Sequence, residues 1–422
     1  MSDNTATPDT PYYRVLLCAS GMSPAIITET LYALITRPDP FWPDEIHIVS
    51  TTQGCRALQR ELLQPRLDAH GQPQPTPVQA LLADYWPADR PPPRWGADTL
   101  HPIQDFDDIN SPAAHQAAGD TLFHTYWQLQ RGHPLQRSGS AAQWPVQIHA
   151  SIAGGRKTMS FLMGHVFSLL AQPQDQLSHV LVNPPFEHVQ PPFYFKPRQP
   201  QTVTYQPHNQ PAQTLSTAQA HIELGLIPAL QLGQATWMPQ HWRNDTTPTP
   251  AMSLSRAVRL FNAQNQPEPL VLRVAHPPRS TQLQGQVQLC GITIDLTYMA
   301  FAWLVIYALI KQNPQAFQQR KGLHPAELPA AFWLDLPWAD YVGRRHTGQP
   351  PHFASARSNL DTALHHHIGP AARHYRIASE GSTRKPYRLV TPAHLIKFDD
   401  GAEPEWEMTW VNCLKKHLRP AR

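Results

Sequence analysis

The stretch YRVLLCASGMSPAIITETLYALI, residues 13–35, decides the fold of this chain. Its first six residues form an apolar run that predicts a buried β-strand, and small residues follow directly. A helical pattern then begins, with Ser23 suited to the N-cap and Pro24 to the first turn. EIHIVSTT, residues 45–52, predicts a second strand. A strand, a helix and a strand in this order indicate an open, mainly parallel sheet of the Rossmann-like α/β class.

The rest of the N-terminal half extends this pattern. VQIHASIA, residues 146–153, reads as a strand that runs into a pair of glycines. We expect residues 68–102, which are rich in proline and polar side chains, to form an irregular excursion. The remaining expected elements are helices at 111–130 and 158–170, a strand at 179–184, and edge strands at 193–195 and 221–230.

A second pattern begins near residue 281. Residues 286–296 alternate like a strand or a hairpin, a buried helix is expected at 297–310, and another helix at 354–367. Two short strands, 374–379 and 386–391, then flank a polar turn. A helix followed by a basic hairpin is typical of a winged helix, so we expect a C-terminal α+β domain of that kind. The predicted division is 1–235 for the α/β domain, 236–280 for a linker and 281–422 for the winged-helix-like domain.

Composition favours a protein with long polar loops and no membrane span. Of 422 residues, 46 are proline and only 15% are charged, and no glycine period is present. The longest apolar run, residues 299–310, is too short to cross a bilayer. The four cysteines form no CxxC pair and are expected to be buried, reduced thiols. We therefore expect a soluble, cytoplasmic protein.

Charge is unevenly distributed along the chain. Residues 281–422 hold 16 Lys/Arg and 11 Asp/Glu, whereas residues 1–280 hold 18 and 20. Within residues 341–397 the counts are 9 and 2. This basic segment is a candidate surface for an anionic partner.

Two loops are candidates for anion binding. Residues 20–24 follow the first strand, and residues 151–159, SIAGGRKTM, follow the strand at 146–153. Ligands of open α/β sheets bind outside the carboxyl ends of the strands, where free N–H groups of helix N-termini favour phosphate. The first loop alone is also consistent with a plain strand-to-helix turn. The second places Arg156 and Lys157 at a helix start, where the dipole repels cations, so an anion is expected nearby. It is not a P-loop, because Arg156 separates Gly155 from Lys157.

These blocks resemble a known family. LLCASGMSPAIITETLYAL, EIHIVSTTQG, HASIAGGRKTMSFLM and HVLVNPPFE occur in the order found in CRISPR-associated ring nucleases with a CRISPR-associated Rossmann fold (CARF) domain. The resemblance covers about residues 12–235, and SIAGGRKTM is its most specific block. It implies a homodimer that binds a cyclic oligoadenylate, with the tetramer favoured, across its two-fold axis. No protein cofactor is implied.

The resemblance also implies the site residues. By position, the first loop would contribute from Ser20 to Ser23, and the second from Gly154 to Thr158 together with Ser151. The strand block at 45–54 supplies weaker candidates. The full ligand-binding set is Ser20, Gly21, Met22, Ser23, Thr51, Thr52, Gly54, Ser151, Gly154, Gly155, Arg156, Lys157 and Thr158.

The cleavage chemistry that the resemblance implies needs no metal. Each 3′–5′ linkage of the ring has its own 2′-hydroxyl, and in-line attack leaves a 2′,3′-cyclic phosphate. The protein then has to hold the ribose geometry and stabilise the developing negative charge. Lys157 and Arg156 are the candidate charge partners, and Ser20 or Ser23 would orient ribose or phosphate oxygens. No general base is evident, because His149 and His165 are expected to be structural.

Several other motifs are weaker. The acids between Asp105 and Asp108 suit a solvated loop better than a metal site. Arg320 and His324 fall one residue short of the Arg-x4–6-His motif of a ribonuclease domain, and residues 365–367, three adjacent histidines, point in different directions on a helix.

Two classes of function therefore remain open. One is an enzyme that destroys the cyclic messenger, and the other is a messenger-gated DNA-binding regulator with little or no cleavage. In the second class the duplex would meet cations of the recognition helix and the wing, although a winged helix that serves only packing or dimerisation is equally consistent. The residues concerned are Arg357, Asn359, Arg373, Arg384, Lys385 and Arg388.

Overall fold

The computed structural model of the chain divides into two compact units, residues 1–234 with 246–255, and residues 235–245 with 256–422. No helix among the described residues is long and apolar enough to cross a membrane. The structure describes residues 12–67, 71–131, 144–234, 237–245, 247–249, 251–275, 284–318, 320, 322–335, 352–379, 386–399 and 406–418.

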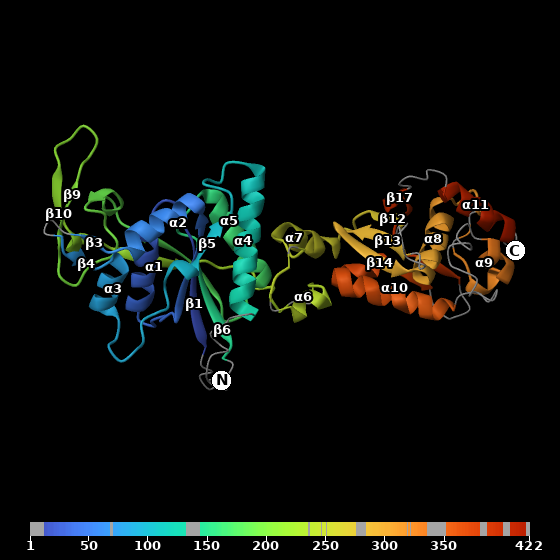
Figure 1. Cartoon of the computed structure of the whole chain (residues 1–422), viewed down its shortest axis with the longest axis horizontal. Coiled ribbons are helices and arrows are strands. Elements are labelled where there is room, and N and C mark those ends of the chain that lie inside the picture. Colours follow the sequence, from blue (N-terminus) through green and yellow to red (C-terminus); the bar gives the residue numbers. More distant parts are fainter. Residues whose placement is uncertain are drawn as a thin grey trace, which may run out of the picture. The chain divides into compact units, whose positions relative to one another are not determined.

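A six-stranded sheet forms the centre of the first unit (Figure 1). The strand order is β11-β7-β6-β1-β2-β5, and every neighbouring pair is parallel except the edge pair of β11 with β7. Residues 15–19 of β1 are 0% exposed, which explains why this strand is a continuous apolar run. The predicted α/β class with a mainly parallel sheet is confirmed. The strands are β1 Tyr13–Ala19, β2 Glu45–Thr51, β5 Leu100–Ile103, β6 Val146–Ser151, β7 Gln176–Val182 and β11 Ile222–Leu226.

Helices lie on both faces of this sheet. Figure 1 shows α1 and α3 on one side of the strands and α4 and α5 on the other. The expected helices near 111–130 and 158–170 are confirmed within one residue at each end. The helices of the first unit are α1 Ala25–Thr36, α2 Thr52–Leu58 with a π-helical extension Gln59–Leu63, α3 Pro77–Tyr85, α4 Pro112–Arg131 and α5 Lys157–Leu170.

The expectation of irregular chain over residues 68–102 was wrong in two places. Helix α3 begins there with a complete capping box, in which Thr76 and Gln79 each satisfy a backbone N–H of the other. This S/T-x-x-E/Q pattern, with proline at the first helical position, is a helix-start signal that the surrounding prolines obscured. The strand β5 also begins in this segment and pairs in parallel with β2.

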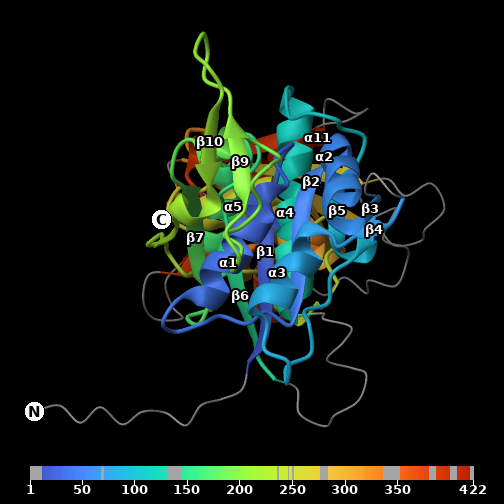
Figure 2. The same cartoon turned by 90° about the vertical axis from the view of Figure 1, so that its left-hand side faces the viewer.

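Smaller differences concern the ends of elements. The helix α1 has Pro24 at its N-cap, and no side chain caps it, so Ser23 does not have the expected role. Residues 193–195 form no strand, whereas β11 does form the expected edge. Short strands make two additional small sheets, and Figure 2 shows the hairpin of β9 and β10 projecting from this unit. These strands are β3 Arg66–Leu67, β4 Pro73–Gln74, β8 Val189–Gln190, β9 Thr202–Tyr205 and β10 Gln213–Ser216.

The second unit is built on a four-stranded sheet of order β14-β13-β12-β17. Residues 286–296 form the hairpin that the sequence allowed, with Cys290 and Gly291 at φ values of 51° and 71°, as a tight hairpin turn requires. The ring of Phe301 on α8 lies directly on the backbone of Gly285, where a Cβ atom would be 1.8 Å from the ring. The elements are α6 Gln240–Asn244, α7 Leu254–Ala263, β12 Leu270–Ala275, β13 Gln284–Leu289, β14 Ile292–Thr297, α8 Tyr298–Gln312 and β17 Ile396–Asp399.

Beyond α8 the chain adds helices and a short hairpin. Leu323, between α8 and α9, forms an antiparallel bridge with Tyr387 of β16. β16 also pairs with β15, so β16 joins β15 and the extended segment at Leu323. The elements here are α9 Ala330–Asp335, α10 Phe353–Ile368, β15 Ile377–Ser379, β16 Tyr387–Leu389 and α11 Trp406–His417. The segment 236–280, for which we expected a linker, contains α6, α7 and β12, and all four cysteines are free and buried as expected.

A buried carboxylate holds the turn between α5 and β7. Asp175 is 3% exposed and accepts hydrogen bonds from the backbone N–H groups of Ile148 and Gln172, each at 2.8 Å. It also accepts the hydroxyl of Tyr126 at 2.8 Å. Burial raises the pKa of this carboxyl, while these donors oppose the shift. Asp175 therefore ties α4, β6 and the end of α5 together.

Substitution Asp175→Ala should lower the free energy of unfolding by about 2–4 kcal/mol, because it leaves buried donors without an acceptor. The loss is measured by urea denaturation followed by circular dichroism. Asp39→Ala, the same change at an exposed position, is the control and should stay within about 0.5 kcal/mol of the parent. Equal effects of the two substitutions would contradict this role of Asp175.

Candidate functional site

A cleft of about 1000 Å³ lies at the carboxyl edge of the parallel sheet. Three segments, its walls, supply most of the lining: the loop between β1 and α1, the loop between β6 and α5, and the segment that leads from β5 into α4. The junction of β2 with α2 adds Thr51 and Gln53. Parallel strands place their carboxyl ends at one edge, so these loops meet although they are far apart in the sequence. The lining residues are Gly21, Met22, Ser23, Thr51, Gln53, Asp107, Asp108, Ile109, His115, Gly155, Arg156, Lys157, Thr158 and Met159.

The first two loops touch through glycine backbone. A Cβ atom on Gly21 would lie 2.9 Å from the Cα atom of Gly155. Gly155 itself has a φ of +85°, which an L-residue with a side chain rarely adopts. Behind them, a Cβ atom on Gly154 would lie 2.6 Å from Ile26 and 2.9 Å from the carbonyl oxygen of Ala19. Glycine is therefore required here for the two loops to approach each other.

Two helices begin at this cleft without a side-chain cap. α1 starts after Pro24 and α5 starts after Arg156, and at neither N-terminus does the N-cap side chain accept a hydrogen bond from a backbone N–H group. Backbone N–H groups of a first helical turn have no partner within the helix, and the helix dipole places partial positive charge there. Two such ends at one cleft favour an anion.

Two cations stand at the start of α5. Lys157 and Arg156 are both exposed and both line the cleft. Arg156 forms a two-point ion pair with Asp108, with its Nε donating to Oδ1 at 2.7 Å and a second N–H donating to Oδ2. This hydrogen bonding raises the pKa of Arg156 and lowers that of Asp108. Among the described residues, Lys157 is the cation of the cleft lining that has no partner.

The structure brings most of the predicted site residues together and leaves the others beneath the cleft. Ser20 and Ser151 are 0% exposed, so their hydroxyls do not face the cleft. The Ser20 hydroxyl has no hydrogen-bond partner among the described residues. Thr52 bonds to the carbonyl of Ile103 at 3.4 Å. Gly54 and Gly154 pack behind the loops, while Gly21, Met22, Ser23, Thr51, Gly155, Arg156, Lys157 and Thr158 line the cleft.

Sequence reasoning missed the third wall. Asp107, Asp108 and His115 follow β5, which was not recognised as a strand. The rule that located the other two loops would have located this one, since β5 also ends at the carboxyl edge of the sheet. Ser111, whose hydroxyl accepts the N–H of Ala114 at 3.2 Å, is the helix-start signal that follows it.

The two histidines that were judged structural lie outside the cleft lining. His149 is 0% exposed and bonds to the hydroxyl of Ser178 at 2.7 Å, and burial lowers its pKa to about 3. His165 lies against the ring of Phe161 on α5, at 4.4 Å between ring centres. Among the described residues, no three His, Cys, Asp or Glu side chains are placed to hold a metal ion.

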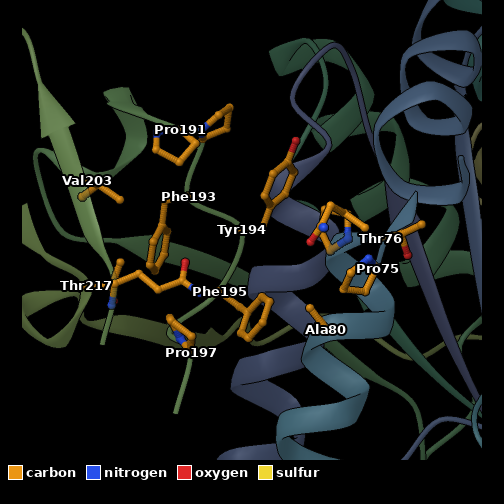
Figure 3. Close-up of a pocket in the computed structure, with 14 residues that line it drawn as sticks. Pro75, Thr76, Ala80, Pro191, Phe193, Tyr194, Phe195, Pro197, Val203 and Thr217 are labelled. Carbon is orange, nitrogen blue, oxygen red and sulfur yellow. The ribbon is translucent and has the colours of Figure 1, made fainter. Parts of the chain in front are cut away.

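A second cavity in the same unit is smaller and of a different kind. It measures about 220 Å³ and is lined mainly by prolines and aromatic rings, including Phe193 and Phe195 (Figure 3). Its hydroxyl groups are already engaged, since Thr76 caps α3, Thr217 accepts the N–H of Gln201 and Tyr194 donates to Glu61 at 3.1 Å. This cavity therefore has fewer groups available to bind an anion than the cleft has.

Fold and site together define an α/β protein with a cleft at the carboxyl edge of its parallel sheet, where two helix starts and Lys157 meet. The profile of the family described as CRISPR-associated protein NE0113 matches residues 23–257, more than half of the chain. The chain therefore belongs to this CRISPR-associated family. The matched region contains the second and third walls of the cleft and begins within the first, at Ser23. No curated protein matches the sequence.

The ion pair of Asp108 with Arg156 leads to a prediction about the cleft. Asp108→Asn frees Arg156 for a ligand and should tighten the binding of inorganic triphosphate about two- to fivefold, as expected for loss of one exposed competing pair. Calorimetric titration measures this change. Asp108 also accepts the N–H of Ile109 at 2.8 Å, a bond that asparagine retains, so the loop should keep its structure.

Asp107→Asn is the matched control, because it removes a second negative charge from the same lining without touching the pair. It should have a smaller effect. If both substitutions tightened binding equally, the change would reflect net charge alone, and the ion pair would have no specific role.

Proposed function

We propose that this protein binds a cyclic oligoadenylate, with the tetramer favoured, in the cleft at the carboxyl edge of its parallel sheet. The observation that carries the proposal is the meeting of two uncapped helix N-termini with Lys157 at one cleft. Membership of a CRISPR-associated family supports a nucleotide messenger of the CRISPR response over other polyanions. The sequence blocks that resemble those of CARF ring nucleases also contain the loop between β1 and α1 and the loop between β6 and α5.

A symmetric dimer would suit a ligand of this shape. Met22 at the cleft is 55% exposed, and Phe161, one turn along α5 from Lys157, is 66% exposed. Exposed apolar side chains beside a binding site are typical of surfaces that meet a partner. A second copy of the chain related by a two-fold axis would place two equal clefts around one cyclic ligand.

The proposed reaction is cleavage of the ring by its own 2′-hydroxyl groups. The 2′-oxygen attacks the adjacent phosphorus, the bond to the 5′-oxygen breaks, and a 2′,3′-cyclic phosphate and a 5′-hydroxyl result. No metal is required, because the nucleophile belongs to the substrate. Lys157 stabilises the extra negative charge, and Arg156 does so once the ligand displaces Asp108. Ser20 takes part only if its buried hydroxyl turns toward the ligand.

The test is incubation of the pure protein with cyclic tetraadenylate, followed by chromatography and calorimetry. We expect one ligand per two chains, linear products with a 2′,3′-cyclic phosphate, and activity that survives EDTA. Lys157→Ala should slow cleavage about ten- to a thousandfold, as for removal of one charge partner of a transition state. Lys196→Ala, which removes the same charge outside the cleft, is the control.

Three outcomes would contradict the proposal at different levels. Absence of binding for every ring size would remove the ligand assignment. One ligand per chain would remove the shared site at a dimer axis. Binding without cleavage would leave a sensor, which is the alternative function.

That alternative is a messenger-gated regulator that binds duplex DNA through a winged helix in the second unit. Its support is the order of elements: α8, the bridged segment at Leu323, α9, α10 and the hairpin of β15 and β16. In this arrangement α10 would be the recognition helix and the hairpin the wing. Asn359 on α10 is exposed, whereas Arg357 lies over the rings of Phe353 and Tyr387. Arg384 and Lys385 lie outside the described residues.

If this alternative holds, the full chain should shift duplex DNA in a gel at low salt and lose affinity steeply as salt rises. Arg388→Ala should weaken binding and reduce the salt slope by about 0.9, the amount expected for one phosphate contact. Lys415→Ala, which removes an exposed cation of α11, should leave the slope unchanged. A chain that binds no DNA even at low salt would leave the second unit as a packing or dimerisation domain.

A further inference from the structure

The proposed cleavage reaction needs an acceptor for the proton of the attacking 2′-hydroxyl. The cations at the start of α5 are donors, and two of the three serines assigned to the site, Ser20 and Ser151, are buried. An uncommitted imidazole or carboxylate in the cleft lining would complete the chemistry. This inference rests on the proposed function, since it assigns a further role at the same site.

His115 is placed for that role. It lies in the first turn of α4 and lines the cleft together with Lys157 of α5, and the two helices pack side by side (Figure 1). Its backbone N–H donates to the carbonyl of Ser111 at 3.0 Å within the helix. Its imidazole has no hydrogen bond, ion pair or ring contact with the described residues. The side chain is therefore available to a ligand.

Several other histidines of this unit are engaged elsewhere. His47 bonds to Glu45 at 2.6 Å and to His101 at 2.9 Å. His124 bonds to the carbonyl of Met252, and His149 bonds to Ser178. Among the histidines that the structure describes, His115 is the one in the cleft lining.

The charged groups of the cleft lining come from two parts of the chain. Asp107 and Asp108 face the cleft from the segment before α4, and Arg156 and Lys157 face it from α5. Asp108 is tied to Arg156, whereas Lys157 lines the same cleft as His115. An imidazole that can accept a proton and a cation that can stabilise negative charge are therefore present in one site.

We propose that His115 is the catalytic general base of ring cleavage. Its neutral ring nitrogen takes the proton of the 2′-hydroxyl as the 2′-oxygen bonds to phosphorus. The bond between phosphorus and the 5′-oxygen breaks, and the leaving oxygen takes a proton from the ammonium group of Lys157. Solvent then restores both side chains, so one ring linkage becomes one 2′,3′-cyclic phosphate and one 5′-hydroxyl.

The experiment is single-turnover cleavage of cyclic tetraadenylate by the full-length protein across a range of pH. The wild-type rate should fall on acidification, as His115 becomes protonated. His115→Gln should lose about 10²–10⁴-fold in rate and no longer show that acidic limb. His115→Ala should be rescued in part by added imidazole, which a merely structural role would not allow. Ligand affinity, measured by calorimetry, should change only a few-fold.

His165→Gln is the matched control, because His165 is an exposed histidine of α5 outside the cleft lining. It should retain the wild-type rate and pH profile. If the wild-type protein cleaves and His115→Gln cleaves equally fast with the same pH profile, the role of His115 is overturned while the proposed function stands. If the wild-type protein binds the ring without cleaving it, the cleavage proposal and the role of His115 both fail.

Discussion

The contact between Gly21 and Gly155 is the constraint on which the cleft depends. With 2.9 Å between a would-be Cβ of Gly21 and the Cα atom of Gly155, no side chain fits between the loops. This approach places the N-termini of α1 and α5 at the same cleft, and neither has a side-chain cap. Two partial positive charges then reinforce each other instead of being satisfied locally. These uncapped helix starts are the reason for proposing an anion-binding site at the cleft instead of a plain strand-to-helix turn.

The parallel sheet and two of the three walls could be predicted from the sequence, because the patterns that indicate them are local. Apolar strands, glycine turns and helix starts near residues 20–24 and 151–159 each lie within a few residues of one another. The third wall was missed because β5 is only four residues long and follows a proline-rich segment. The burial of Ser20 could not be predicted from the sequence either. A residue at the end of a central parallel strand is covered on both faces, and the loop sequence does not show where that cover ends.

In the second unit, the contacts of the basic residues say more about their availability to nucleic acid than the number of charges does. The basic excess of residues 341–397 suggested a nucleic-acid surface, but several of these cations already have partners. Arg357 lies 5.3 Å from the ring centre of Tyr387, and Arg373 donates to the carbonyl of Gln264. A guanidinium that supports packing is less available to phosphate, although its charge still contributes to the local field. Sequence identifies the cations, and only the fold shows which of them remain available.

The ion pair of Arg156 with Asp108 bears on which anion the cleft selects. Asp108 acts as an internal substitute for a ligand, so an incoming phosphate has to replace two charge-assisted hydrogen bonds before it gains from Arg156. Under the proposed function, a single phosphate group that reached one helix N-terminus or Lys157 would gain little to offset that loss. A cyclic ligand with several phosphates at fixed spacing would contact both helix N-termini and Lys157 together, and its ring would already limit its conformational freedom. Asp108 would then disfavour small anions more than a rigid polyanion, so a residue that opposes binding would increase selectivity.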